Sequence, residues 1–117
     1  MTKAMYIPVD APPRVVEYNG YDELKALVGG WIEGIGGDVG GSGTHVWSGY
    51  VDEEGKIKGL PVNDEATIFA GATGWYGAGS DVLCGPVVII GPPDEEGDDT
   101  DVPQWLLYLA DLAETES

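Results

Sequence analysis

The 117-residue sequence has few basic residues, one cysteine, one histidine and no long apolar run. Five lysines and arginines stand against 21 aspartates and glutamates, so the formal net charge is −16. This charge disfavours direct binding to nucleic acid or to anionic membrane surfaces, because every approach begins with repulsion. A single cysteine excludes both an intrachain disulfide and a zinc site built from several cysteines.

Apolar stretches are short throughout the chain. No stretch approaches the roughly 18 apolar residues of a membrane-spanning helix, and residues 1–13 lack an apolar run long enough for a signal peptide. We therefore expect a cytoplasmic protein. With 43% hydrophobic residues, the chain is long enough for one domain with a core and too short for two.

The first half of the sequence predicts two strands and a helix. Residues 4–10 and 14–18 are rich in strand formers. Asn19 is the expected N-cap of the helix, which is predicted as far as Val28, and Gly29-Gly30 predict a kink or the close approach of another backbone. The apolar residues at helical spacing are Leu24, Leu27, Val28, Trp31, Ile32 and Ile35.

The middle of the sequence follows a glycine-rich connection over residues 34–44. Residues 45–51 predict a strand with Trp47, Gly49 and Val51 on one face. The next segment predicts a hairpin: Gly55 would supply a positive φ at the turn, and Lys56 and Lys58 would face solvent on the returning strand. Asn63 is the expected N-cap of a short helix that follows.

The last part of the sequence predicts a buried strand over residues 82–91, because Val87 to Ile90 form an unbroken apolar run. An acidic linker at 94–101 leads to a helix that begins near Asp101, covers 102–117 and packs on the core formed by residues 1–93. The fold class is α+β: one compact domain in which an antiparallel sheet of about four strands packs with two or three helices.

Catalytic and metal-binding interpretations find little support in the sequence. His45 is the only histidine, and nothing indicates the oriented nucleophile and acid that a hydrolase triad needs. Cys84 lies in the predicted buried strand of an acidic protein, whereas a reactive thiolate needs exposure and positive surroundings. The glycine tract lacks a phosphate-binding pattern, and the acidic linker lacks the spacing of a calcium loop. We expect no enzymatic activity, no cofactor and no metal.

Three segments carry a family resemblance: LVGGWIEGI at 27–35, VDEEGKIKGLPVNDEAT at 51–67 and DVLCGPVVIIG at 81–91. In this order and spacing, the chain resembles domain of unknown function 3846, a family of small bacteriophage and bacterial proteins, often of actinobacteria. The resemblance covers residues 4–91 and implies a compact domain of viral origin, without implying an activity. The glycine tract and the acidic linker with its tryptophan-bearing helix look individual to this chain.

The candidate binding residues are acids and aromatics. Carboxylates along the linker would attract a basic partner and imitate phosphates, although the same acids would also serve solubility or an unrelated protein contact. Trp75 and Tyr76, between glycines, would be interface anchors if exposed, or would fold back over the sheet. The candidates are Trp75, Tyr76, Asp94, Glu95, Glu96, Asp98, Asp99, Asp101 and Trp105.

The sequence thus predicts a non-enzymatic phage accessory protein that binds a host or phage protein with a basic surface. A sharper hypothesis is an acidic, nucleic-acid-mimicking inhibitor of a DNA-binding or defence factor. One alternative is a small-ligand binder that sequesters a nucleotide-derived signal, with its anion site drawn from Arg14, Lys25, Lys56 or Lys58. Another is a virion structural or assembly protein. The partner and the oligomeric state, including a homo-oligomer, stay open.

Overall fold

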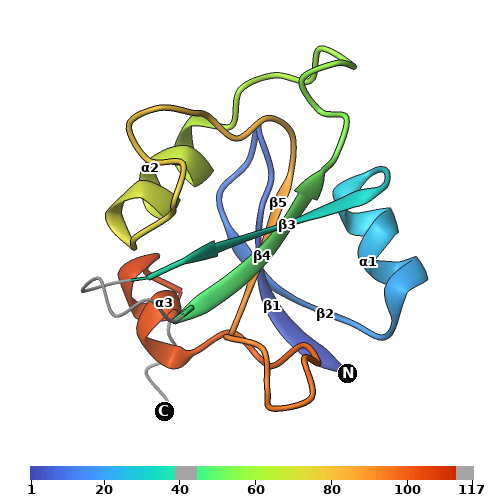
Figure 1. Cartoon of the computed structure of the whole chain (residues 1–117), viewed down its shortest axis with the longest axis vertical. Coiled ribbons are helices and arrows are strands. Elements are labelled where there is room, and N and C mark those ends of the chain that lie inside the picture. The colour runs from blue at the N-terminus through green and yellow to red at the C-terminus, as the bar shows by residue number, and fades with distance from the viewer. Residues whose placement is uncertain (39–44, 113–117) are drawn as a thin grey trace.

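A computed structural model describes residues 1–38 and 45–112. In this part of the chain lies an antiparallel five-stranded sheet of order β2-β1-β5-β4-β3, with three helices around it (Figure 1). The fold class is therefore α+β, as predicted, with one strand more than expected. The elements in chain order are β1 Thr2–Ile7, β2 Arg14–Tyr18, α1 Tyr21–Val28, β3 Ile32–Gly37, β4 Trp47–Asp52, α2 Asp64–Ala72, β5 Val87–Ile90 and α3 Gln104–Leu109.

The central strand is β5, which pairs with β1 on one side and β4 on the other. All four of its residues are buried, which confirms the prediction of burial on both faces for the run from Val87 to Ile90. Strand β4 shows the predicted alternation, with Trp47, Gly49 and Val51 buried between half-buried residues. Short-range patterns thus identified the two strands that fill the middle of the sheet.

The two faces of the sheet carry separate apolar clusters. On one face, Trp47 packs with α2 and α3, which contribute Ala70 and Leu106 among others. On the other face, Val88 and Ile90 of β5 pack with α1. Figure 1 accordingly shows α1 far from α2 and α3, so the helices cover the sheet from opposite sides.

The first helix ends at Val28, as predicted, although the helical spacing of apolar residues continues past it. Gly29 ends α1 in the left-handed conformation, with φ 93°, and donates its N–H to the carbonyl of Lys25. The chain then turns into β3, and Trp31 between the two elements is 57% exposed. The apolar residues at helical spacing therefore lie partly in α1 and partly in β3. The positive φ of Gly29 ends the helix even though the apolar spacing continues.

The N-cap of α1 and the close approach at Gly30 differ from the prediction. Gly20, not Asn19, is the N-cap residue and makes no side-chain hydrogen bond, while Glu23 accepts the backbone N–H of Asn19 at 2.6 Å. Gly30 is explained by close approach, since a Cβ there would lie 2.8 Å from Asp52 Oδ2 and from Lys58 Nζ. The approaching group is a side-chain ion pair, where the sequence analysis expected backbone.

The predicted hairpin after β4 is wrong. Residues 53–59 form successive turns, and positive φ occurs at Gly59 (73°) rather than at Gly55. A returning strand has no place, because β4 already pairs with β3 and β5. Asn63 is the N-cap of α2, as predicted, and accepts the N–H of Ala66.

The last helix is shorter than expected. It begins at Gln104 after an N-cap at Pro103, so Asp101 lies before it. Leu106 and Leu107 are buried, whereas Leu109 is 60% exposed. Part of the glycine connection (39–44) and the predicted helix end (113–117) lie outside the described residues.

Candidate functional site

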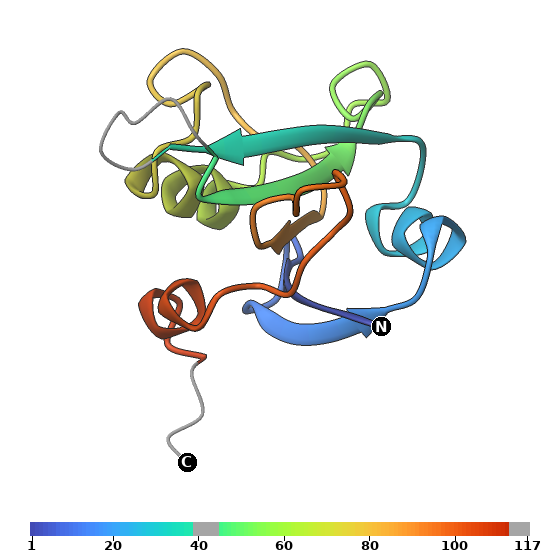
Figure 2. The ribbon, with the colours of Figure 1, turned by 60° about the horizontal axis from the view of Figure 1, so that its bottom comes forward.

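The predicted acidic linker is a loop tied to the sheet; we call residues 92–101 the acidic loop. Figure 2 shows it, in brown and orange, beside β4. Its main tie is Asp99, whose two carboxylate oxygens accept the hydroxyl groups of Tyr18 and Tyr50, each at 2.6 Å. The two tyrosines come from β2 and β4, on either side of the β1–β5 pair. One aspartate therefore fixes the loop across the width of the sheet.

The electrostatics of this tie follow from burial and charge. Burial, then the hydrogen bond to Asp99 and its negative charge, raise the pKa of Tyr18 well above the ordinary value of 10.0. The same causes in the same order raise the pKa of Tyr50. Both tyrosines therefore hold their protons and act as donors to the carboxylate.

Both ends of the acidic loop are fixed as well. The Thr100 hydroxyl donates to the carbonyl of Pro92 at 2.6 Å, and Gly91 donates its N–H to Thr100. Asp101 accepts the backbone N–H of Lys3 at 2.9 Å, and Val102 returns a bond to the Lys3 carbonyl. These bonds preorganise the loop, so a partner that binds it would not have to order it first.

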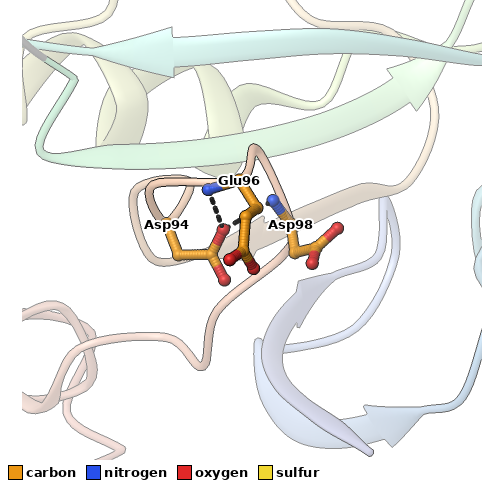
Figure 3. A group of neighbouring side chains, drawn as sticks. All are labelled: Asp94, Glu96 and Asp98. Atoms are coloured by element: carbon orange, nitrogen blue, oxygen red, sulfur yellow. Dashed lines mark hydrogen bonds between the residues drawn. The ribbon is translucent and has the colours of Figure 1, made fainter.

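The tip of the loop is a tight turn with its carboxylates in solvent (Figure 3). Asp94 Oδ1 accepts the N–H groups of Glu96 and Asp98, each at 2.9 Å, and Gly97 adopts a positive φ of 83°. One carboxylate oxygen each of Asp94, Glu96 and Asp98 lies within 4.8 Å of the others. The turn gathers negative charge at one exposed point.

These three acids could hold a cation, but the geometry defines no metal site. Calcium takes six to eight oxygen ligands, whereas the cluster offers three exposed carboxylates. One oxygen of Asp94 already accepts two backbone N–H groups. The cluster attracts cations diffusely.

The six predicted acids therefore have two different roles. Asp99 is half-buried, and its charge serves to anchor the loop. Asp101 is exposed, but it accepts a backbone N–H at the base of the loop. The acids exposed on the tip are Asp94, Glu95, Glu96 and Asp98.

The three predicted aromatics also separate. Trp75 is 8% exposed and belongs to the core cluster, so it folds back over the sheet and is not an interface anchor. Tyr76 is 60% exposed, with its ring centroid 5.3 Å from that of His45. Trp105 is 41% exposed on α3. Tyr76 and the acidic loop line one hollow of about 400 Å³, together with Tyr50 and His45.

Sequence reasoning missed Tyr18 and Tyr50 as the residues that position the loop. Their spacing from Asp99 in the sequence, 81 and 49 residues, gives no local signal. It also counted Trp31 among the apolar residues at helical spacing, although this residue is exposed with Lys25 Nζ 4.1 Å from its ring centroid. The glycine pair before Trp31 was the available signal for a chain reversal.

A second hollow, of about 440 Å³, lies between β3 and the segment that leads to β5. Lys56 lines it and forms an ion pair with Asp81. Cys84 also lines it and is half-buried, outside the named strands. A third hollow, of about 580 Å³, is mostly apolar and lies between α2 and α3.

One protein family matches this chain over nearly its whole length. Residues 1–114 match the family described as domain of unknown function (DUF3846). The match includes the acidic loop and α3, which the sequence analysis had set apart as individual to this chain. No curated protein and no solved structure matches. The chain belongs to the DUF3846 family.

Proposed function

We propose that this protein is a non-catalytic binding protein of a bacteriophage, and that it acts on a host or phage protein with a basic surface. The observation that carries the proposal is the acidic loop, in which Asp99 is bound by two tyrosines while the four acids of the tip stay exposed. A rigid, charged loop steers a basic partner into contact and loses little conformational entropy on binding.

The finer proposal is that the acidic loop occupies the nucleic-acid-binding surface of a defence or DNA-binding factor in the host cytoplasm. Clustered carboxylates offer a basic groove the negative charge that it otherwise finds on phosphates. The net charge of −16 extends this attraction beyond the loop. The described residues contain no helix long and apolar enough to cross a membrane.

The bases invoked for an anionic ligand each have another contact. Arg14 lies over the ring of Tyr6, Lys25 over Trp31, and Lys58 bonds to Asp52. Of those four, only Lys56 lines one of the three hollows described above, and Asp81 already binds it. These contacts favour the protein-binding proposal over sequestration of a nucleotide-derived signal.

The test is affinity capture from host lysate at low and high salt, with the recovered proteins identified by mass spectrometry. The variant replaces the four exposed acids of the loop tip by their amides and leaves Asp99 and Asp101 in place. Its matched control changes charge equally at four exposed acids elsewhere: Asp10, Glu17, Glu54 and Glu65.

We expect one basic nucleic-acid-binding protein, captured by the wild type and the control and lost with the tip variant or with added salt. Equal loss from both variants would mean that net charge alone holds the partner. A partner retained by both at high salt would contradict the proposal and move the site away from the acidic loop.

A further inference from the structure

Strand β3 is an edge of the sheet with an open outer side. It pairs with β4 from Ile32 to Gly37. In the part of the chain that the structure describes, its outer side pairs only at its end, where Gly37 bridges to Trp75 and Asp38 donates to the Gly74 carbonyl. Among the described residues, none pairs with the outer edge from Ile32 to Ile35.

The register indicates which backbone groups face outward. Hydrogen-bonded and non-hydrogen-bonded pairs alternate along antiparallel strands. Glu53 donates its N–H to the carbonyl of Trp31, one step before the pair of Ile32 with Asp52. Counting from this bond, Ile32 and Gly34 turn their N–H and C=O groups away from β4.

Hollows on both sides accompany this edge. The hollow of about 440 Å³ and the hollow of about 400 Å³ are both lined by Gly34, Ile35, Gly36 and Tyr76. An added strand makes main-chain hydrogen bonds to an edge and directs alternate side chains to opposite sides. The paired hollows match that alternation.

The edge also lacks the usual protection against added strands. Exposed edges are commonly blocked by lysine, proline or a bulge. Strand β3 reads IEGIGG, and its only charged residue is Glu33. At the opposite edge, β2 follows Pro12 and Pro13 and begins with Arg14.

Charge selects the occupant of the β3 edge. One hollow is lined by Glu33 and Glu53 in addition to the Lys56–Asp81 ion pair, so acids outnumber bases there, and Asp99 of the acidic loop lines the other hollow. A second copy of the chain would bring another net charge of −16 and its own Glu33 to this edge. A basic segment would instead meet acids on both sides.

We propose that the β3 edge binds an extended basic segment of the partner protein as a sixth strand, with alternate side chains entering the two hollows. The proposal rests on the proposed function, since it takes the partner to be basic. It adds main-chain hydrogen bonds at the β3 edge to the charge attraction of the acidic loop. Charge attraction alone would not require such hydrogen bonds.

The first test uses the wild-type chain and a synthetic probe. The probe is a short, acetylated and fluorescently labelled peptide of alternating arginine and valine. Its control carries N-methyl groups on two adjacent central residues, which removes one N–H from each edge of the peptide and keeps its charge. We expect fluorescence anisotropy to show roughly tenfold weaker binding of the control, because lost main-chain hydrogen bonds lower affinity.

The second test changes the protein. Gly34→Pro removes the outward N–H, whereas Gly34→Ala keeps it, and a Cβ at this position has no atom within 4 Å. We expect Gly34→Pro to weaken probe binding roughly tenfold and Gly34→Ala to leave it within about threefold. Hydrogen exchange of the wild type should slow at Ile32 and Gly34 on adding the probe, and not at Val15 of the opposite edge.

Equal binding of both peptides, with no slowing at Ile32 and Gly34, would overturn strand addition and leave the acidic-loop proposal standing. Failure of the probe to bind at low salt would also overturn it, while capture from lysate tests the proposed function separately. Sedimentation that shows a dimer lost in Gly34→Pro would assign the edge to a second copy and overturn the basic segment.

Discussion

Two loops leave the sheet after β4 and β5, and each is tied down by one aspartate. For the turn segment, residues 53–63, the aspartate is Asp52 at the end of β4, which is buried and bonded to Lys58 at 2.6 Å. In the acidic loop it is Asp99, which accepts two tyrosine hydroxyl groups. The first anchor is neutralised by a cation, and the second keeps its negative charge.

This difference shows that one aspartate can stabilise the fold while another holds an exposed, negatively charged loop in place. Burial alone would raise the pKa of Asp52, but hydrogen bonds from Lys58 and from the Glu54 N–H outweigh it and lower the pKa below its usual range. Around Asp99, hydroxyl donors fix a carboxylate without cancelling its charge. The turn segment is therefore built for stability, and the acidic loop adds its anchor's charge to that of its tip.

The largest expected effect lies at the end of the turn segment. Asn63 is fully buried, donates to the carbonyls of Ile7 and Gly85, each at 2.9 Å, and caps α2. We expect Asn63→Ala to lower the free energy of unfolding by about 3 kcal/mol, because it leaves buried partners unsatisfied and removes a cap. Urea unfolding followed by circular dichroism measures the change.

The matched control for this change is Asn19→Ala, since Asn19 is exposed and its side chain does not cap α1. We expect the control to stay within about 0.5 kcal/mol of the wild type. Comparable losses at the two asparagines would mean that the buried hydrogen bonds of Asn63 contribute little to the turn segment.

The next effect concerns the acidic loop. Asp99→Ala removes two hydrogen bonds to a half-buried carboxylate, so we expect a loss of about 2 kcal/mol. Asp98→Ala, one residue away on the exposed tip, should cost less than about 0.5 kcal/mol. Urea unfolding of the pair measures both values, and equal costs would remove Asp99 from its role as the anchor.

Local patterns predicted much of the fold. The run from Val87 to Ile90, the alternation along β4 and the cap at Asn63 each depend on residues close together in the sequence. Strand β3 was missed because Ile32 and Ile35 also fit the period of the preceding helix. The false hairpin after β4 could be rejected only from the sheet order, which no local pattern contains.

The candidate site was predictable in its charge and not in its construction. Composition located the acids, which the sequence analysis placed in a linker. The role of Asp99 depends on Tyr18 and Tyr50, which the topology brings to it from distant strands. The burial of Trp75 likewise follows from its bridge to Gly37 of the unpredicted strand β3.

Alkaline pH should also distinguish the two loops. The raised pKa values of Tyr18 and Tyr50 mean that the folded protein holds protons that the unfolded chain loses above the ordinary value of 10.0. Stability is therefore complete below that value and falls as the pH rises beyond it. Urea unfolding at several pH values between about 9 and 12 should show this fall.

In Asp99→Ala the fall with pH should be shallower, because the hydrogen bonds and the negative charge of Asp99 contribute to the raised values, while burial remains. Lys58→Gln, in the turn segment, serves as the control and should keep the wild-type slope. A slope unchanged by Asp99→Ala would assign the raised pKa values to burial alone.

The smallest effect compares the two lysines of the turn segment. Lys58 binds a buried carboxylate, whereas Lys56 pairs with the exposed Asp81. We expect Lys58→Gln to cost about 1 kcal/mol at neutral pH, since Asp52 keeps a hydrogen-bond donor but loses its counter-charge. Lys56→Gln should leave the urea midpoint unchanged, because exposed ion pairs contribute little. If Lys56→Gln proved the costlier change, the turn segment would be stabilised mainly by the ion pair of Lys56 with Asp81. The ion pair of Asp52 with Lys58 would then not be the feature that distinguishes the turn segment from the acidic loop.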